Sequence, residues 1–279
     1  AHMRRIVSDK DWREKLIAVT SQNNSLLCVG LDTDSKKIPS FLLETSKTPL
    51  LDFNKAIVDA TKDLVCAYKL NMAFYEVAGK KGIDALQQTI HYIPGNILII
   101  LDGKRNDIGN TARQYAQSLF DTFKADAVTL NPYLGKDGIL PFLDYKDNCS
   151  FILCRTSNPS AGDFQDLLVS SIPLYQIVAQ KIREWDVHKN CGAVVGATYP
   201  EELRTVRRIL GEDIPILIPG IGKQGGDVEK TVKNGTNTQG EMALINSSRE
   251  VIFAGQQEDF AQQARIKAES VRNTINKYR

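Results

Sequence analysis

The sequence predicts an α/β protein that folds as a single (β/α)8 barrel. Short apolar runs alternate with longer amphipathic stretches from one end of the 279-residue chain to the other. The apolar runs are continuous, which is typical of strands that are buried on both faces of a parallel sheet. Eight strand-then-helix units in this length match a closed barrel, whose usual size is about 250 residues.

The eight predicted strands are the apolar runs rich in β-branched and aliphatic residues. They are 26–31, 65–70, 97–101, 127–130, 151–154, 192–196, 214–218 and 242–245. The helices predicted between and after them are the amphipathic stretches 50–64, 82–92, 108–123, 137–143, 171–185, 200–210, 227–234 and 259–278.

A doubly wound dinucleotide-binding fold is the alternative architecture. Its first turn would carry a GxGxxG motif, whereas residues 30–34 here read Gly-Leu-Asp-Thr-Asp. We find no linker, charge block or low-complexity segment, so residues 1–279 are expected to form one domain. Residues 1–3, Ala-His-Met, resemble a cloning remnant.

Composition limits the partners and the compartment. The formal net charge is +2, too close to balance to favour nucleic acid or anionic lipid as a partner. Five cysteines without paired spacing favour a reducing, cytoplasmic setting over a disulfide framework. No apolar run is long enough to cross a bilayer. No His, Cys or carboxylate cluster has metal-ligand spacing, so we expect no bound metal.

Charged residues gather where the second and third strands should end. Active sites of this fold lie at the C-terminal ends of the strands. Asp102 and Lys104 are two apart and can share one face of an extended segment, and Lys69 ends the neighbouring strand. Asp107 follows three residues after Lys104 and could approach a partner subunit. Such an array suits reactions in which charge moves or disappears, with an ammonium ready to protonate a carbanion. A purely structural ion-pair network is the alternative.

The loops after the last two strands predict a phosphate site. Barrels of this type often hold phosphate there through backbone N–H groups. The loop after the seventh strand contains four glycines: Gly220, Gly222, Gly225 and Gly226. Arg249, after the eighth strand, can bind two phosphate oxygens, and Gln224 can donate a further hydrogen bond. A glycine-rich turn beside a solvated arginine is the alternative.

Two further strand ends carry weaker signals. Asp32 could accept hydrogen bonds from a ribose hydroxyl, or it could cap the segment that follows. Residues 156–159, Thr-Ser-Asn-Pro, offer polar groups for a planar base, although Asn-Pro also marks a turn. Arg105 should point to the face opposite Lys104, which favours a structural role.

These residues together resemble the orotidine 5′-phosphate decarboxylase family over nearly the whole chain. Residues 102–111, Asp-Gly-Lys-Arg-Asn-Asp-Ile-Gly-Asn-Thr, are similar to the Asp-x-Lys-x-x-Asp-Ile signature of that family. Residues 29–32 resemble its first strand end, and Lys69 resembles its second-strand lysine. The remaining family positions follow in order at 156–159, at 219–222 with Gln224, and at 247–249.

The resemblance implies a barrel homodimer that converts orotidine 5′-phosphate to uridine 5′-phosphate and CO₂ without metal or cofactor. It implies that Lys104 donates a proton to the ring carbon that loses its carboxylate. It also implies that Asp102 lies against this carboxylate. Lys69 and the partner chain's copy of Asp107 would complete the array.

The resemblance also implies the binding residues. Asp32 and Asn71 would contact the ribose, with Ile108 and Thr111 reaching in from the partner chain. Ser157 would read the pyrimidine. Gln224, Arg249 and nearby backbone amides would hold the phosphate, and Pro219, Gly220 and Ser248 would also bind the substrate.

The sequence departs from the animal and fungal pattern in two places. Residues 69–76 read Lys-Leu-Asn-Met-Ala-Phe-Tyr-Glu, which looks more like the branch of many bacteria and of apicomplexan parasites. Gly225 follows Gln224 directly, so the contacts of a closing loop differ from the fungal ones. Two other functions stay open from the residues alone: a Mg²⁺-dependent sugar-phosphate decarboxylase or aldolase on the same barrel, and a phosphometabolite-binding barrel without turnover.

Overall fold

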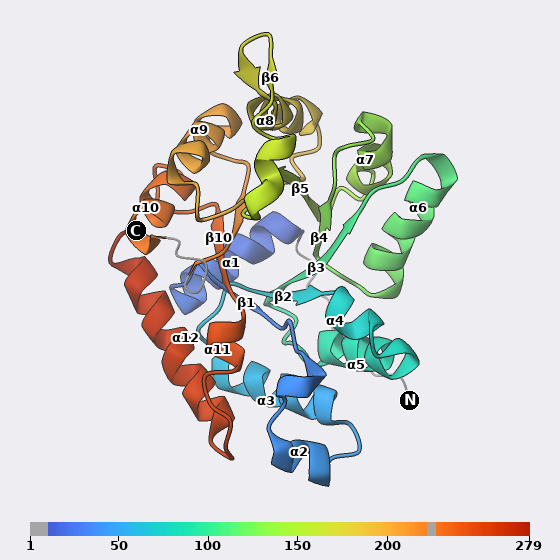
Figure 1. The fold of residues 1–279 in the computed structure, drawn as a ribbon, viewed down its shortest axis with the longest axis vertical. Coiled ribbons are helices and arrows are strands. Elements are labelled where there is room, and N and C mark those ends of the chain that lie inside the picture. Colours follow the sequence, from blue (N-terminus) through green and yellow to red (C-terminus); the bar gives the residue numbers. More distant parts are fainter. Residues whose placement is uncertain (1–10, 222–226) are drawn as a thin grey trace.

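Eight parallel strands form a closed barrel (Figure 1). The computed structural model describes residues 11–221 and 227–279. The barrel strands are β1 (Leu27–Gly30), β2 (Ala67–Asn71), β3 (Leu98–Arg105), β4 (Ala127–Leu130), β5 (Cys149–Arg155), β8 (Cys191–Val195), β9 (Ile216–Pro219) and β10 (Ala243–Ser247). Each pairs with its neighbours in the barrel, and β10 pairs with β1 to close it. The predicted (β/α)8 barrel is confirmed.

Helices surround the barrel. In chain order they are α1 (Trp12–Asn23), α2 (Ser40–Thr45), α3 (Pro49–Thr61), α4 (Ala73–Glu76), α5 (Gly79–Tyr92), α6 (Gly109–Gln117), α7 (Lys136–Leu143), α8 (Leu174–Trp185), α9 (Pro200–Leu210), α10 (Val228–Gly235), α11 (Arg249–Ile252) and α12 (Phe260–Asn276). Three short helical turns complete the set: η1 (Ser35–Lys37), η2 (Ser118–Thr122) and η3 (Pro159–Asp163). Within the described ranges, every helix is too short or too polar to span a bilayer.

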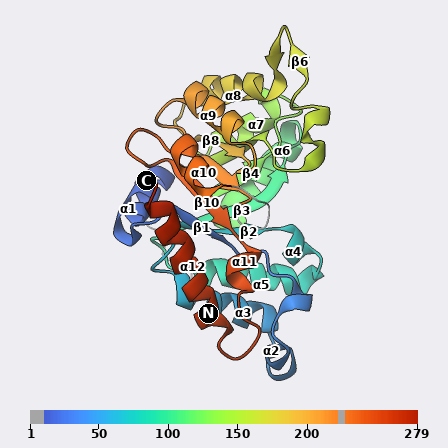
Figure 2. The same cartoon turned by 60° about the vertical axis from the view of Figure 1, so that its left-hand side comes forward.

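The apolar runs form strands because both of their faces are covered. Every residue of β1, β4, β8 and β10 is buried, and the helices lay their apolar faces on the outside of the barrel. Figure 2 shows α12 beside α10 and α3, where the last helix closes the ring. Asp227 begins α10 by accepting a hydrogen bond from the Lys230 amide.

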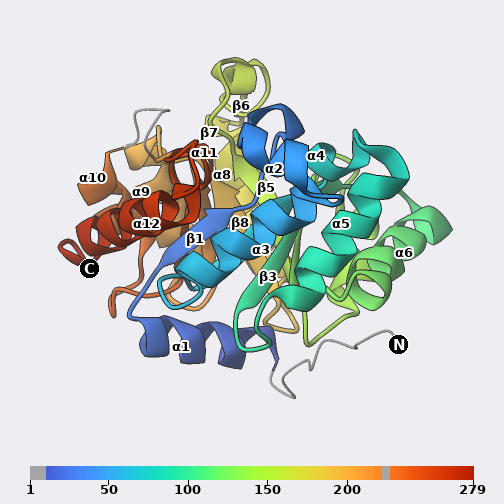
Figure 3. The same ribbon diagram turned by 90° about the horizontal axis from the view of Figure 1, so that it is seen from below.

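Helix α1 was not predicted from the sequence, and it covers one end of the barrel (Figure 3). Its buried face mixes Trp12, Leu16 and Val19 with the polar residues Lys15 and Thr20, so the apolar spacing of a helix is interrupted. The Lys15 ammonium, 2.8 Å from both carboxylate oxygens of Asp126 on the barrel, offsets the cost of burying these two charges. The opposite end carries α2, α4 and the β6–β7 hairpin.

The predicted helix 171–185 is wrong over its first three residues. A two-stranded hairpin, β6 (Leu168–Val169) and β7 (Ile172–Pro173), precedes α8. Its turn residues Ser170 and Ser171 have φ of 49° and 68°, the left-handed pair that a tight hairpin turn needs. The sequence did not show this turn because neither residue is Gly, Asn or Asp, the usual occupants.

Candidate active site

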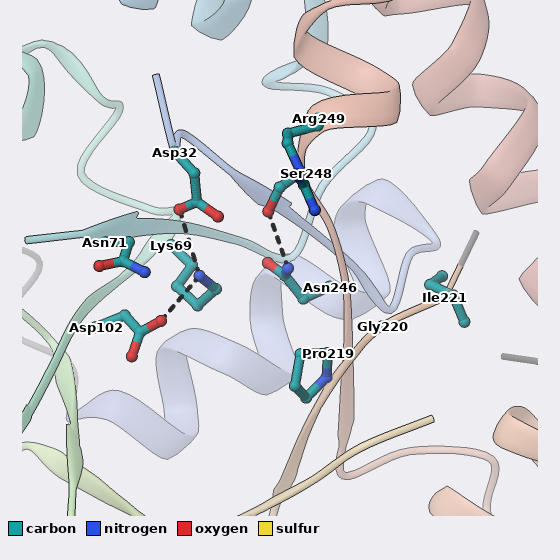
Figure 4. A pocket seen from close by; sticks show the side chains of 10 residues that line it. All are labelled: Asp32, Lys69, Asn71, Asp102, Pro219, Gly220, Ile221, Asn246, Ser248 and Arg249. Carbon is teal, nitrogen blue, oxygen red and sulfur yellow. Dashed lines mark hydrogen bonds and ion pairs between the residues drawn. The ribbon is translucent and has the colours of Figure 1, made fainter. Parts of the chain in front are cut away.

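A pocket of about 200 Å³ opens at the C-terminal ends of the barrel strands. Figure 4 shows its two walls, one from the first three strands and one from the last two. The lining residues are Asp32, Lys69, Asn71, Asp102, Pro219, Gly220, Ile221, Asn246, Ser248 and Arg249. The structure therefore brings together eight of the residues predicted from the sequence, in the part of the chain that it describes.

Three of the four predicted array residues form one chain of charges. The Lys69 ammonium lies 3.1 Å from Asp102 Oδ2 and 3.5 Å from Asp32 Oδ1. The Lys104 ammonium lies 2.7 Å from Asp102 Oδ1. Lys69 and Asp102 are nearly buried, with side chains 5% and 8% exposed, whereas Lys104 is 47% exposed. Lys104 is thus the cation of the array with room to meet a ligand.

A break in the β3–β4 register lies at Lys104, which is not one of the lining residues but contacts the pocket wall at Asp102. The pairing shifts between Leu101 and Arg105, and Lys104 itself has φ of 47°. A non-glycine residue in this left-handed region is strained, and the surrounding structure must compensate. The hydroxyl of Thr129 compensates here, because it accepts the Lys104 amide at 3.0 Å and donates to Asp102 Oδ1 at 2.7 Å.

The array keeps Asp102 and Lys69 ionised. Burial acts to raise the pKa of Asp102, but the positive charges of Lys69 and Lys104, with hydrogen bonds from Lys104 and Thr129, hold that pKa well below its ordinary value. Burial acts to lower the pKa of Lys69, and the charges of Asp32 and Asp102 outweigh it, so the pKa of this lysine is raised. A ligand in the pocket therefore faces fixed charges that bulk water does not reorganise.

We expect Asp102 to stay ionised when the pH falls below about 3.9, the ordinary value for aspartate. Because its pKa is lowered in the folded chain, its contribution to stability is present above that value and is lost as the pH falls through the folded-state pKa. A ¹³C titration of its carboxyl group, assigned by comparison with Asp102→Asn, measures this midpoint. Lys69→Met should raise it, whereas Lys277→Met at the far C-terminal end should not. Equal midpoints in all three proteins would contradict the assigned cause.

Asp107, the fourth predicted array residue, does not line the pocket of its own chain. Its carboxylate accepts the amide of Ile108 at 2.8 Å, and among the described residues it forms no ion pair. The side chain of Ile108 is 59% exposed, and Thr111 is exposed on α6. These three predicted residues lie where β3 leads into α6, and none of them lines the pocket of this chain. Arg105, by contrast, pairs with Glu76.

The second wall of the pocket comes from β9, β10 and the start of α11. Gly220 has φ of 97°, which favours glycine. Arg249 is exposed at the rim and forms no ion pair in the described part of the chain. A side chain on Gly30 would collide with Ser248 Oγ, so this glycine lets Ser248 approach β1. The predicted contact Gln224 lies outside the described residues.

Ser157 does not line the pocket, and β4 and β8 separate its strand, β5, from the lining strands β3 and β9. It follows β5 and touches Gly196, where an added Cβ would come within 2.7 Å of the Ser157 Cβ. Its neighbour Thr156 is fixed by Gln165, which accepts the Thr156 amide at 2.8 Å and donates to the Thr156 hydroxyl at 2.8 Å.

Sequence reasoning missed three residues of the site. Thr129 supports Asp102 and Lys104, and Asn246 and Ile221 line the pocket. The sequence signal for Thr129 is a hydroxyl inside an otherwise apolar strand, since a buried polar side chain needs a partner. Asn246 carries a similar signal, and its Oδ1 is buried with no hydrogen-bond partner among residues 11–221 and 227–279. Among the described residues, no group of three or more His, Cys, Asp or Glu side chains is arranged to hold a metal ion.

Comparisons with known proteins agree with this geometry. The model of the orotidine 5′-phosphate decarboxylase / HUMPS family matches residues 25–264. The orotidine 5′-phosphate decarboxylase of Cellvibrio japonicus is 50% identical over 269 residues, which cover 94% of this chain and 97% of that protein. That of Cupriavidus taiwanensis is 49% identical and covers 96% of this chain and 98% of its own length. The solved structure of Leishmania donovani OMP decarboxylase superposes with a TM-score of 0.82 at 33% identity, covering 95% of this chain and 99% of that one.

Proposed function

The chain belongs to the orotidine 5′-phosphate decarboxylase / HUMPS family, and from this premise we propose how its pocket performs the reaction. The chain is a carboxy-lyase that converts orotidine 5′-phosphate to uridine 5′-phosphate and CO₂, a step of pyrimidine nucleotide synthesis. The observation that carries the mechanism is the Lys104 ammonium, 2.7 Å from Asp102 at the pocket.

The charged array stabilises the carbanion that decarboxylation leaves behind. The bond between the ring carbon and the carboxylate breaks, CO₂ departs and the electron pair stays on the ring carbon. The Lys104 ammonium then donates its proton to that carbon. Asp102 lies against the carboxylate, so its repulsion with the substrate disappears as CO₂ leaves. The stabilisation is thus stronger in the transition state than in the bound substrate, as catalysis requires.

The remaining pocket residues hold the rest of the nucleotide. Asp32 and Asn71 lie beside Lys69 on the wall that we assign to the ribose, and Asp32 accepts hydrogen bonds from its hydroxyl groups. Ser157 reads the pyrimidine from the end of β5. Pro219, Gly220, Ser248 and Arg249 form the opposite wall. This wall receives the phosphate, with Gln224 as a further donor.

Arg249 supplies a charge-assisted contact to the phosphate. Arg249→Ala should weaken the binding of uridine 5′-phosphate about 100-fold, or about 2.8 kcal/mol, as the loss of a bidentate arginine contact predicts. Isothermal titration measures the dissociation constant directly. Arg272→Ala on α12 removes the same charge at a site remote from the pocket and should leave the constant unchanged. An unaltered affinity in Arg249→Ala would remove this residue from the phosphate site.

A homodimer completes the site. Asp107, Ile108 and Thr111 lie on the surface where β3 leads into α6, and Ile108 exposes a large apolar side chain there. In a twofold dimer this surface meets the equivalent surface of the second copy, so that each chain delivers Asp107 to the partner's array and Ile108 and Thr111 to the partner's nucleotide.

The overall assignment has a direct test. Purified protein, added to orotidine 5′-phosphate in the presence of a chelator, should change the ultraviolet absorbance as the orotate ring loses its carboxylate. A Mg²⁺-dependent sugar-phosphate enzyme of the same barrel would lose its activity in chelator and would not act on this nucleotide. The five cysteines are unpaired and buried, which supports a cytoplasmic enzyme.

A further inference from the structure

A buried hydrogen-bond network lies behind the pocket and reaches the chain on both sides of Asp32. It joins Thr33, Asn54, Tyr75 and Thr89, whose side chains are at most 1% exposed. These four residues come from the loop after β1 and from α3, α4 and α5. None of them lines the pocket.

The hydrogen bonds of this network have donor–acceptor distances between 2.7 and 3.0 Å. Thr33 donates to Asn54 Oδ1 at 2.7 Å, and the Asn54 amide donates to Tyr75 Oη and to Thr89 Oγ1, each at 3.0 Å. The Tyr75 hydroxyl donates to the Leu31 carbonyl at 2.8 Å. A fully paired polar network in a low-dielectric interior is rigid, because any rearrangement leaves a buried polar group without a partner.

Asp32 needs such support because it lies beyond the end of β1. The ladder bond from the Leu31 amide to the Lys69 carbonyl, 2.8 Å, fixes the chain just before it. The Tyr75 contact then holds the Leu31 carbonyl, and the Asn54 contact holds Thr33 just after it. Asp32 is thus the single residue between two anchored neighbours, with its carboxylate 3.5 Å from the Lys69 ammonium.

The packing of α4 against α5 places Tyr75 where its hydroxyl reaches the Leu31 carbonyl. A side chain on Gly82 of α5 would collide with the Tyr75 carbonyl, so the glycine lets the two helices approach. The network therefore depends on elements that are far from Asp32 in the sequence.

We propose that Asn54, Tyr75 and Thr33 are positioning residues, which hold Asp32 in the orientation that it needs to contact Lys69 and the ribose. The proposal rests on the function assigned to Asp32 above. Small displacements of a group that orients substrate are costly, and about 1 Å can cost 10²-fold in rate. In this proposal the network acts on catalysis through Asp32.

Tyr75→Phe tests this proposal with the removal of one oxygen atom. We expect kcat/KM for orotidine 5′-phosphate to fall about tenfold or more. The matched control is Tyr68→Phe, since Tyr68 is also fully buried and its hydroxyl bonds Thr61 on α3 at 2.7 Å, away from the Asp32 segment. The control should lose thermal stability to a similar extent but keep kcat/KM. Equal kinetic losses in both variants would overturn the proposal.

Two substitutions at Thr33 distinguish the effect of its hydrogen bond on kcat/KM from the effect of its packing. Thr33→Val keeps the shape and loses the hydroxyl, whereas Thr33→Ser keeps the hydroxyl and loses a methyl group. We expect the valine variant to share the kinetic loss of Tyr75→Phe and the serine variant to retain kcat/KM. The reverse order would show that packing matters and would overturn the proposal.

A double-mutant cycle with Asp32→Ala shows whether the network acts through this residue. In the Asp32→Ala background, Tyr75→Phe should change kcat/KM by less than about twofold. An undiminished further loss would overturn the positioning role. Wild-type kinetics in Asp32→Ala itself would instead overturn the function assigned to Asp32, and this proposal with it. Wild-type kinetics in Tyr75→Phe beside an impaired Asp32→Ala would overturn the positioning role alone.

Discussion

Lys104→Ala should lower kcat for decarboxylation by about 10⁴-fold or more. Loss of a general acid costs up to about 10⁴-fold, and loss of one preorganised electrostatic partner costs about 10²- to 10³-fold. In the proposed mechanism Lys104 combines both functions, because its ammonium donates the proton and lies 2.7 Å from Asp102. Discontinuous or continuous ultraviolet absorbance assays at saturating orotidine 5′-phosphate measure this fall in kcat.

The Lys104→Ala substitution should slow the chemical step and leave nucleotide binding nearly unchanged. Lys104 is 47% exposed and contacts Asp102 at one side of the array, so the fold and the phosphate wall do not depend on it. Uridine 5′-phosphate should bind Lys104→Ala within about tenfold of the wild-type affinity. Lys277→Ala, an exposed lysine at the other end of the chain, is the control for the change in net charge and should be fully active. Turnover near the wild-type rate in Lys104→Ala would refute the assignment of the proton donor.

Asp107→Ala should be nearly inactive alone and should regain activity when it shares a dimer with Lys104→Ala. Removing one electrostatic partner costs about 10²- to 10³-fold, so each variant alone retains little activity. In the proposed dimer, a pair of the two variants has one site with Lys104 from one chain and Asp107 from the other. Random pairing of equal amounts leaves about one quarter of all sites intact, and the specific activity should recover to that fraction.

The physical basis is the position of Asp107 in the subunit. Its carboxylate caps the backbone of its own Ile108 at 2.8 Å and does not line its own pocket. Mixing Lys104→Ala with a chain that carries both substitutions is the control, because no intact site can form. If the first mixture also recovers nothing, each subunit contains a complete site and the shared arrangement is wrong.

Local sequence pattern was sufficient for the barrel and for much of the site. Strand candidates such as 127–130 coincide with an observed strand, and the predicted end of the second strand placed Lys69 beside Asp102. These predictions succeed because a strand buried on both faces must be apolar throughout. A charge at its end therefore stands out in the sequence.

The failures share a cause, which is dependence on contacts distant in the chain. Helix α1 buries Lys15 because Asp126, over one hundred residues away, supplies the opposite charge. Nothing near Lys15 in the sequence indicates this partner. Ser170 and Ser171 adopt left-handed backbone conformations although neither is Gly, Asn or Asp. The pairing of the two flanking strands determines the conformation of this turn.

The sequence by itself determined the closed βα architecture and the residue types of the charged array, because periodicity and strand-end charges are local properties of the chain. Only the tertiary structure decided how those charges are aimed. Hydrogen bonds between separate elements fix these orientations. Thr129 supports the left-handed backbone of Lys104, and Tyr75 holds the Leu31 carbonyl just before Asp32. The free energies of these hydrogen bonds exist only once the barrel has brought those elements together, so no window of sequence can contain them.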